Sequence, residues 1–402
     1  MKWEKVKLGE LYEVHNGLSK AGKFFGEGYP FLTFSTVFNN YFIPKQITDL
    51  VQSTEKEQES YSIRRGDVFV TRTSETSDEL GMSCVALKDY PMATYNGFTK
   101  RMRPITNRVF PEYIGYYMRL PSFRGEFRAF STMTTRASLR NEDLLGLEVK
   151  LPSIEIQKQI ADILSAYDDL IENNQKQIKL LEEAAQRLYK EWFVDLRFPG
   201  HENTKIVDGV PEGWQWCKVR DVADINSSAL PKNYKEDFID YVDLGSVRCG
   251  HIETRARYNL NEAPGRAKRC AKDGDIIWGM VRPNLKAYAL VTNPKETDVF
   301  STGFAVLSAK KVPYSYLYCA VTQEEFVGYL VNATNGAAYP AVKPVHFEVA
   351  DILKPDDKVL EQFHSVADSI YRKKEALENQ NHNLRESRGL ILPKLMSGEV
   401  EV

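Results

Sequence analysis

Two stretches of this chain carry the same seven-residue apolar repeat, and they lie 203 residues apart. The repeat runs through Ile160, Tyr167, Asn174, Leu181 and Leu188, and again through Phe363, Ile370, Leu377, Leu384 and Ile391. A heptad repeat of this length predicts a long helix that pairs along an apolar seam. Its recurrence at a constant offset indicates duplication. The sequence therefore predicts two copies of a domain plus a helix, folded around an internal pseudo-twofold axis.

A second apolar series follows three residues after the first and would complete the seam. It consists of Ile163, Leu170, Gln177 and Ala184, matched by Val366, Lys373, Gln380 and Ser387. The middle of both helices is polar, and buried polar seam positions fix the register of paired helices. A helix over residues 155–192 would span about 57 Å. We expect antiparallel pairing, because a parallel pair would require the intervening domain to return the chain along the whole helix.

A third apolar series widens the face of the first helix. It consists of Leu164, Ile171, Ile178, Ala185 and Trp192. One partner helix cannot cover a face of this width, and exposed apolar patches mark protein interaction sites. We therefore expect another protein to pack on Leu164 and Ile171.

The two copies repeat the same short patterns in the same order. Each begins near a tryptophan, Trp3 or Trp214, and continues to a Gly-Asp turn before a buried strand. Residues 96–98, Asn-Gly-Phe, align with residues 302–304, Thr-Gly-Phe. Residues 195–213 have no periodicity and are framed by Pro and Gly, which predicts a linker. The second helix is expected to stop near Leu392.

Length and composition suit a globular protein of two or three domains. The chain has 402 residues, a net charge of −2 and five cysteines without a C-x-x-C motif. We find no leader and no apolar run of membrane-spanning length, so we expect a cytoplasmic protein with no membrane partner. Basic residues are concentrated locally: residues 99–140 hold nine Lys or Arg against two Asp or Glu.

Catalytic and metal-binding motifs are not found in the sequence. Residues 17–23 satisfy G-x-x-x-x-G-K, but Phe24 stands where a phosphate-binding loop needs Ser or Thr, and we expect a flexible polar loop. The six histidines are scattered singly, so no metal site is predicted. A chain of this size without a catalytic constellation favours a binding or scaffolding role.

Polar and basic residues in the loops of both copies suit contact with DNA. Arg bonds guanine edges and Asn bonds adenine edges, while Lys and Thr hold phosphates. The candidate DNA-binding residues are Lys20, Lys23, Arg72, Thr73, Ser74, Lys100, Arg101, Thr135, Arg136, Arg248, Arg282, Asn284, Lys286, Asn335, Tyr339 and Lys343. The candidate residues of the helix pair and its partner surface are Ile160, Ile163, Leu164, Tyr167, Leu170, Ile171, Leu181, Leu188, Phe363, Ile370, Leu377 and Leu384.

The entry to the first long helix carries a resemblance to a known family. Residues 151–164, beginning Leu-Pro-Ser, lead into the helix, residues 188–193 close it, and residues 210–214 open the second copy. The second copy keeps Gln362 opposite Gln159, but its entry reads Lys354-Pro355-Asp356 and is less typical. With residues 392–398 at the C-terminal end, the whole chain resembles the specificity subunit of type I restriction-modification enzymes.

The resemblance implies an α+β fold with two mixed α/β target-recognition domains in tandem, separated by a pair of long antiparallel coiled-coil helices. The expected segments are recognition domain 1 at 1–150, the central helix at 151–194, a linker at 195–213, recognition domain 2 at 214–353, and the second helix with its tail at 354–402.

The resemblance also implies a non-catalytic subunit that binds double-stranded DNA, each domain reading one half of a bipartite target with the helix length setting the spacer. Two methyltransferase subunits and the restriction-translocation subunits would be its partners. S-adenosylmethionine and ATP with Mg²⁺ would be bound by those partners, and no cofactor by this chain. Two alternatives stay open: the specificity protein of a methylation-only or phage-defence complex, and a coiled-coil scaffold with no DNA role.

Overall fold

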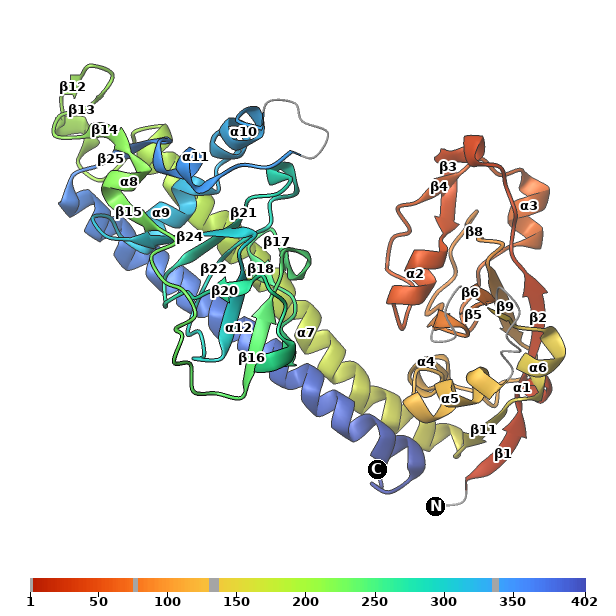
Figure 1. The fold of residues 1–402 in the computed structure, drawn as a ribbon. Coiled ribbons are helices and arrows are strands. Elements are labelled where there is room, and N and C mark those ends of the chain that lie inside the picture. The colour runs from red at the N-terminus through yellow and green to blue at the C-terminus, as the bar shows by residue number, and fades with distance from the viewer. Residues whose placement is uncertain (1–2, 75–78, 130–136, 335–339) are drawn as a thin grey trace. The chain divides into compact units, whose positions relative to one another are not determined.

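The computed structural model describes the chain except for residues 1–2, 75–78, 130–136 and 335–339 (Figure 1). The chain forms two compact units. Unit 1 comprises Met1–Glu172 together with Asn381–Val402, and unit 2 comprises Asn173–Gln380. Each of the two long helices contributes one part to unit 1 and the other part to unit 2.

Unit 1 is built on an antiparallel sheet whose strands follow the order β2-β9-β5-β7. These strands are β2 (Tyr12–Asn16), β9 (Thr99–Pro104), β5 (Val68–Thr71) and β7 (Ser83–Val85). The β-branched and aromatic run of β5 is buried throughout, as expected for a central strand. The turn before it needs Gly66 at φ +88°, and the Asp67 carboxylate accepts a hydrogen bond from the Arg64 N–H at 2.7 Å.

Smaller strands and short helices complete unit 1. The strands are β1 (Glu4–Lys7) paired with β11 (Glu148–Leu151), β3 (Phe25–Leu32) between β4 (Leu50–Val51) and β8 (Thr94–Tyr95), and β6 (Thr73–Ser74) paired with β10 (Ala137–Ser138). The helices are α1 (Leu8–Leu11), α2 (Phe34–Asn39), α3 (Glu55–Ser60), α4 (Pro111–Tyr117), α5 (Pro121–Ala129) and α6 (Asn141–Gly146).

Unit 2 repeats this plan, with the main sheet in the order β15-β24-β21-β22. The strands of this main sheet are β15 (Ala223–Ile225), β24 (Phe304–Ala309), β21 (Ile276–Gly279) and β22 (Tyr288–Leu290). A second sheet has the order β19 (Ala256–Asn259), β16 (Phe238–Val242), β23 (Asp298–Ser301) and β20 (Ala267–Arg269). Three pairs complete the unit: β14 (Gln215–Lys218) with β25 (Asp351–Lys354), β17 (Val247–Arg248) with β18 (His251–Ile252), and β12 (Ile206–Val207) with β13 (Val210–Pro211). Its helices are α8 (Val219–Val222), α9 (Tyr314–Val321), α10 (Glu324–Asn332) and α11 (Pro344–Glu348).

The duplication extends to individual hydrogen bonds. The Tyr113 hydroxyl donates to the Lys150 carbonyl at 2.9 Å, and Tyr316 donates in the same way to Leu353. Both members of the pair are displaced by 203 residues. The predicted alignment of the Gly-Phe turns is wrong by one residue. Val68 pairs with Met102 and Ile276 pairs with Leu307, so Phe98 is equivalent to Gly303 in the repeat. A one-residue slip reverses the face of a strand residue, and accordingly Phe98 is exposed whereas Phe304 is buried.

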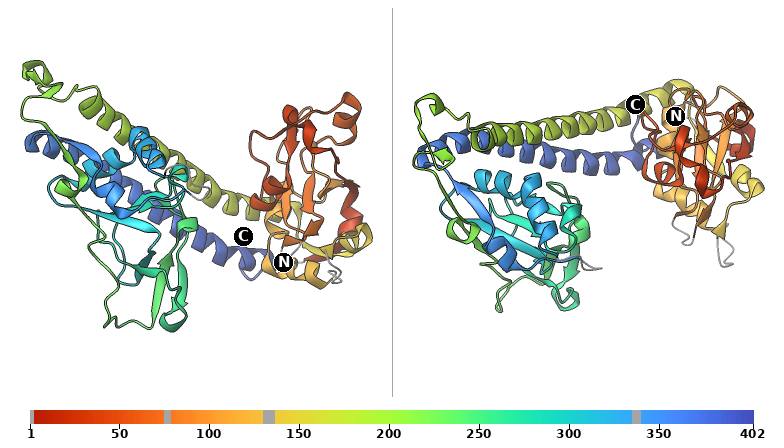
Figure 2. Two further views of the ribbon diagram at one scale, coloured as in Figure 1. Left: turned by 45° about the horizontal axis from the view of Figure 1, so that its top comes forward. Right: turned by 90° about the horizontal axis from the view of Figure 1, so that it is seen from above.

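The long helices are α7 (Ile154–Tyr189), extended by a π-helical turn over Lys190–Val194, and α12 (Asp357–Ser397). In unit 1, Ile160 of α7 packs in one core with Leu395 near the end of α12. In unit 2, the rings of Tyr189 and Phe363 lie 6.3 Å apart. The start of each helix therefore meets the end of the other (Figure 2). The antiparallel prediction and the mixed α/β fold class are confirmed.

The predicted second seam series is wrong. Leu170 is 47% exposed, whereas Leu164 and Ile171, expected to bind a partner, are 0% and 8% exposed. The seam thus consists of the first and third series, whose alternating spacings of four and three residues form a heptad seam. In α12 the third series contains the buried Lys374 and Asn381, so it could not be recognised as apolar.

Two other expectations are corrected near the helix ends. The second helix continues past Leu392 to Ser397, with Pro393 inside it, because Leu395 and Met396 are buried in the core of unit 1. Residues 195–213 are not an unstructured linker. Phe198 is buried with its ring 4.7 Å from that of Trp214, and the β12–β13 hairpin lies between them in the sequence.

Candidate nucleic-acid interface

Three loops of unit 1 meet through backbone hydrogen bonds at Arg72. The Arg72 N–H donates to the Phe98 carbonyl at 3.0 Å, and the Arg72 carbonyl accepts from the Leu139 N–H at 2.9 Å. The next residue, Thr73, pairs with Ser138 in the β6–β10 ladder. Residues 71–74, 96–98 and 137–140, distant in the sequence, therefore form one surface at the end of the main sheet.

Unit 2 repeats this junction at Met280. The Met280 N–H donates to the Gly303 carbonyl at 2.9 Å, and the Met280 carbonyl accepts from the Val342 N–H at 2.8 Å. The Arg282 N–H continues the ladder to the Pro340 carbonyl at 2.8 Å. We call residues 71–74, 96–98 and 137–140 of unit 1 the paired-loop surface of that unit. Residues 280–286, 302–303 and 340–343 form the paired-loop surface of unit 2.

The paired-loop surfaces bring together several residues that the sequence proposed for DNA contact. Those with described side chains are Arg72 and Thr73 in unit 1, and Arg282, Asn284, Lys286 and Lys343 in unit 2. Ser74 contributes its backbone to β6. Thr135, Arg136, Asn335 and Tyr339 lie outside the described residues. For all of these residues, contact with DNA stays a prediction.

Lys100 and Arg101 are corrected by the structure. Their exposed fractions are only 6% and 3%, because both faces of β9 are covered. Lys100 donates to the side-chain oxygen of Asn141, and Arg101 donates to the Ser62 carbonyl at 2.7 Å. Burial, followed by repulsion from nearby Arg72, lowers the pKa of Lys100. Both side chains are therefore buried within the domain and do not belong to its exposed surface.

The loop with the G-x-x-x-x-G-K pattern does not form a phosphate-binding turn. The strand that leads into it, β2, is mostly exposed, and only a 3₁₀ turn over Gly22–Phe24 follows in place of a helix. Lys20 lies 2.8 Å from the Glu57 carboxylate, and this lysine holds the pKa of Glu57 below its usual range. Lys23 is exposed beside the Phe24 ring.

Arg248 extends the paired-loop surface of unit 2. It ends the first strand of the β17–β18 hairpin, and the following Cys249 N–H donates to the Lys286 carbonyl at 2.9 Å. The Arg248 guanidinium is exposed, with Glu253 at 3.9 Å. The hairpin therefore places a fifth candidate residue beside the loop that carries Arg282, Asn284 and Lys286.

A partly buried polar cluster fastens this hairpin to the helix pair. The Lys374 ammonium lies 2.9 Å from the Glu182 carboxylate and donates to the Gly250 carbonyl at 2.8 Å. His251 lies between the carboxylates of Glu182 and Glu378, which raise its pKa to about 9. Because all members lie within unit 2, the cluster fixes the hairpin's position relative to α7 and α12.

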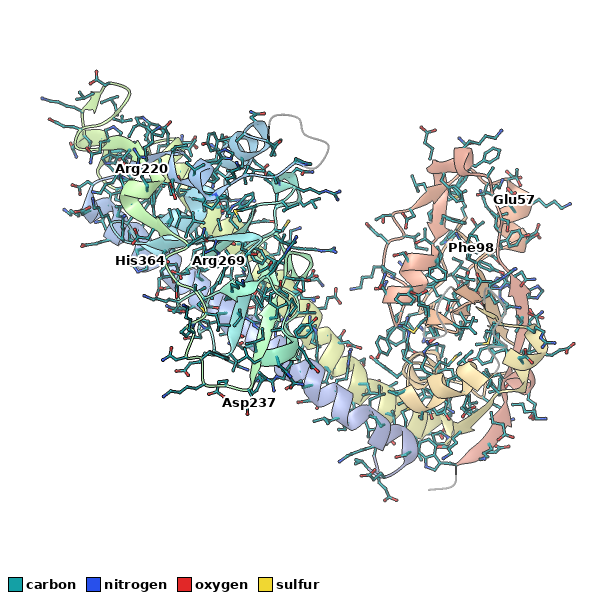
Figure 3. The ribbon with its side chains drawn as sticks, in the orientation of Figure 1. Glu57, Phe98, Arg220, Asp237, Arg269 and His364 are labelled. Atoms are coloured by element: carbon teal, nitrogen blue, oxygen red, sulfur yellow. The ribbon has the colours of Figure 1, made fainter. Side chains whose placement is uncertain are left out.

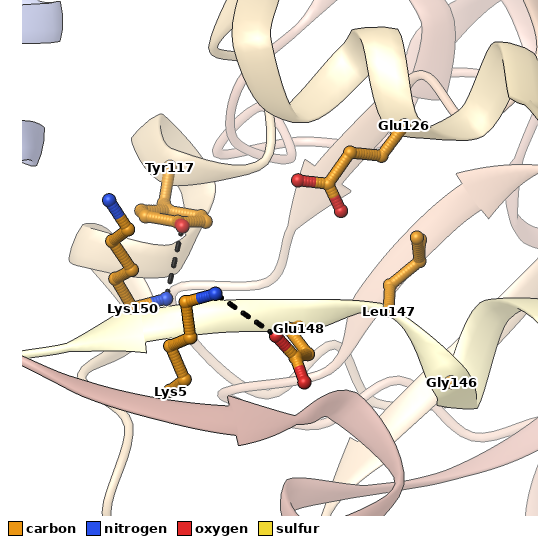
Figure 4. A pocket seen from close by; sticks show the side chains of 7 residues that line it. All are labelled: Lys5, Tyr117, Glu126, Gly146, Leu147, Glu148 and Lys150. Carbon is orange, nitrogen blue, oxygen red and sulfur yellow. Dashed lines mark hydrogen bonds and ion pairs between the residues drawn. The ribbon is translucent and has the colours of Figure 1, made fainter.

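Unit 1 also contains a pocket outside its paired-loop surface. A pocket of about 390 Å³ lies between β1, β11, α4 and α5, and its lysines and glutamates include the pair Lys5–Glu148 at 3.6 Å (Figure 4). Burial, followed by repulsion from Glu148, raises the pKa of Glu126 there.

Among the described residues we find no cluster of three or more His, Cys, Asp or Glu side chains placed to hold a metal. None of the helices in the described part of the chain is long and apolar enough to span a membrane.

Phe98 and Leu285 lie on the paired-loop surfaces but were not selected from the sequence. Phe98 is 60% exposed and Leu285 is 58% exposed. Sequence reasoning chose only polar and basic residues as DNA contacts. The sequence signal that could have identified Phe98 and Leu285 is an apolar residue within a loop that contains Gly or Pro.

The fold and these two surfaces define a protein made of two similar units, and comparisons with known proteins indicate its class. Residues 1–183 match the family model described as the type I restriction modification DNA specificity domain. The chain is 26% identical to the type I restriction enzyme MjaIX specificity subunit of Methanocaldococcus jannaschii, over 100% of this chain and 94% of that protein. It is 21% identical to the HindI specificity subunit of Haemophilus influenzae, over 99% of both chains.

The crystal structure of a type I restriction-modification S subunit from M. genitalium has a similar fold. Its TM-score is 0.59 at 14% identity, covering 98% of this chain and 96% of that chain. Residues 1–183 therefore match the specificity-domain family, and the chain as a whole is similar to type I restriction-modification specificity subunits.

Proposed function

We propose that this chain is the DNA-reading subunit of a type I restriction-modification complex, in which each unit reads one half of a bipartite target. The observation that carries the proposal is the duplicated hydrogen-bond ladder at Arg72 and Met280, which presents equivalent loops with different side chains. A common scaffold with different contacts is what two unlike half-sites require. The continuous helices α7 and α12 would set the spacer between them.

The side chains on the paired-loop surfaces suit the chemistry of DNA. Arg72 and Thr73 belong to one surface, while Arg282, Asn284 and Lys343 belong to the other. Guanidinium groups and amides can read base edges in the major groove, and ammonium and hydroxyl groups bind phosphates. This supports direct readout by residues before Leu151 in one unit and by the region of 214–343 in the other.

The helices also offer a surface for methyltransferase subunits. The exposed apolar residues on them are Leu170, Leu180, Val366 and Leu390. These replace Leu164 and Ile171 as candidate docking residues, because those two side chains are buried. We assign the chain a non-catalytic role. S-adenosylmethionine, ATP and Mg²⁺ would be bound by methyltransferase and restriction subunits.

A domain exchange tests the proposal. Residues 1–150 are replaced by those of another specificity subunit, and the methylated motif is determined by single-molecule methylome sequencing of cells that also carry the methyltransferase. The expected result is a motif with one half changed and the other half and the spacer kept. A change in both halves would contradict one-domain, one-half-site reading.

A coiled-coil scaffold without a DNA role is the alternative of a different class. The reconstituted complex separates the two by its binding to random duplex DNA. A DNA-reading complex should lose affinity linearly with the logarithm of salt concentration, with a slope that reflects several phosphate contacts. A scaffold should show no binding at any salt concentration.

A further inference from the structure

One large apolar side chain stands exposed on the paired-loop surface of each unit. Phe98 occupies this role in unit 1 (Figure 3) and Leu285 in unit 2. The two positions are not equivalent in the repeat, since Gly303 stands opposite Phe98. A side chain at Gly303 would meet Leu244, because a Cβ there would lie 2.6 Å from its Cδ1. Each unit has therefore placed an apolar group on the same surface from a different loop.

The backbone of Phe98 is held on both sides. Its N–H donates to the side-chain oxygen of Asn96 at 2.7 Å, and its carbonyl accepts from Arg72 at 3.0 Å. The preceding Gly97 donates to the Leu18 carbonyl at 2.8 Å, and a Cβ at Gly97 would lie 2.4 Å from the Ser19 hydroxyl oxygen. The turn therefore leaves little room for a side chain at Gly97, and it holds the backbone from which Phe98 projects.

Leu285 is held by a strained loop. It ends a 3₁₀ turn over Pro283–Leu285, flanked by Arg282 at φ +50° and Lys286 at φ +53°. Left-handed conformations of non-glycine residues persist only where the surroundings enforce them. Here Pro283 is buried, and the Leu285 N–H donates to the Arg282 carbonyl at 2.8 Å. The exposed leucine is thus presented by a loop with one preferred conformation.

The neighbours of both residues suit DNA better than a protein partner. Protein docking sites are contiguous apolar patches, whereas Phe98 adjoins Arg72, and Leu285 lies between Asn284 and Lys286. In the DNA major groove the C5-methyl group of thymine is the apolar feature, and it lies among the polar base edges that Arg and Asn read. A single preorganised apolar side chain within a polar surface matches that pattern.

We propose that Phe98 and Leu285 are specificity-determining residues that pack on the C5-methyl group of a thymine, one in each half-site. The proposal rests on the proposed function and deepens it. Burying one methyl group contributes about fourfold in affinity. The contact would also disfavour cytosine, which lacks that methyl group, at the same position.

The test uses the full-length chain in complex with its methyltransferase subunits. Methylome sequencing first identifies the target, and each thymine in it is then replaced singly by deoxyuridine, which lacks only the methyl group. Binding is measured for the wild-type complex, Phe98→Ala and Leu285→Ala. Ile105→Ala and Ile206→Ala are matched controls, because both residues are exposed and apolar but lie outside the paired-loop surfaces. Ile105 follows β9 at the end opposite Phe98.

The wild-type complex should lose about fourfold in affinity at one thymine in each half-site. Phe98→Ala should make binding insensitive to the deoxyuridine replacement in the half-site read by residues 1–150, and leave the other half-site sensitive. Leu285→Ala should have the same effect in the other half-site only. Both controls should keep the wild-type pattern. The assignment for a domain is overturned if its half-site contains no thymine, or if its variant still distinguishes thymine from uracil as the wild type does. It is equally overturned if no thymine in that half-site is sensitive in the wild type.

Failure of the proposed function would look different. The wild-type complex would then methylate no bipartite motif, and this would be seen before any thymine was replaced.

Discussion

His251 and Glu378 lie 2.7 Å apart, from Nδ1 to Oε1, and join the β17–β18 hairpin to α12. On the other side of the imidazole, Nε2 lies 3.4 Å from Glu182 of α7. Lys374 is the cation that also faces this cluster. A protonated histidine can serve both carboxylates at once, so the hairpin's attachment depends on its charge.

The stability of unit 2 should therefore fall at alkaline pH. The pKa of His251 is raised from 6.5 to about 9 in the folded chain. A raised folded pKa contributes stability that is fully present below the unfolded value and is lost as pH rises through about 9. Urea unfolding followed by tryptophan fluorescence between pH 6 and pH 10 measures the effect, since four of the five tryptophans belong to unit 2.

His251→Gln is the matched variant for this measurement. It keeps a hydrogen-bond donor but cannot be charged, so its unfolding midpoint should be lower at pH 6 and less dependent on pH. An identical pH dependence in the variant and the wild type would show that other groups cause the decline.

Truncation of Leu164 should destabilise the protein, whereas truncation of Leu170 should leave its stability nearly unchanged. Leu164 is fully buried in the core of unit 1, so Leu164→Ala should lower the free energy of unfolding by about 2–5 kcal/mol. Leu170 is largely exposed, so Leu170→Ala should change stability by less than about 0.5 kcal/mol. Urea denaturation measures both values.

Docking of the methyltransferase gives the complementary readout. Leu170→Ala should weaken co-purification with methyltransferase subunits, whereas the folded fraction of Leu164→Ala should co-purify normally. The reverse pattern would restore the third apolar series as the partner surface.

The pair Arg103–Asp67 should be a strong local determinant of stability in unit 1. The Asp67 side chain is fully buried, and its carboxylate lies 2.6 Å from the guanidinium of Arg103. Removing one partner of a buried pair leaves an uncompensated charge, so Arg103→Met should cost about 3–5 kcal/mol of unfolding free energy. Arg103→Met with Asp67→Asn should recover part of this loss. A cost below about 1 kcal/mol for the single variant would show that Asp67 is solvated without its partner.

The sequence predicted the order of the elements because both copies repeat the same turns and strands, and each turn has a local cause such as Gly66 before Asp67. It did not predict the phase of the helix seam. Three apolar series lie on α7, and its own pattern does not decide which two are buried. Lys374 and Asn381 are buried in α12, and Lys374 has polar partners there.

The candidate site was predicted only in part for a related reason. Polar residues in loops could be listed, and the ladder at Arg72 and Met280 brings several of them together. Lys100 and Arg101 follow the same basic pattern but belong to a strand that is buried on both faces. Which strand is central depends on pairing between distant segments, and a local pattern does not encode it.

Arg72 and Lys100 should differ in their effect on DNA binding, because only Lys100 is buried. Arg72→Ala removes a cation from the paired-loop surface, so the slope of log K against log salt should become shallower by about 0.9 for a phosphate contact. Lys100→Met should leave that slope unchanged. It should also leave the free energy of unfolding unchanged or raise it, because the lowered pKa of Lys100 reflects the cost of burying its charge. Fluorescence anisotropy with target duplex at several salt concentrations measures the slopes, and urea unfolding measures the stability. A shallower slope for Lys100→Met with an unchanged slope for Arg72→Ala would reverse the two assignments.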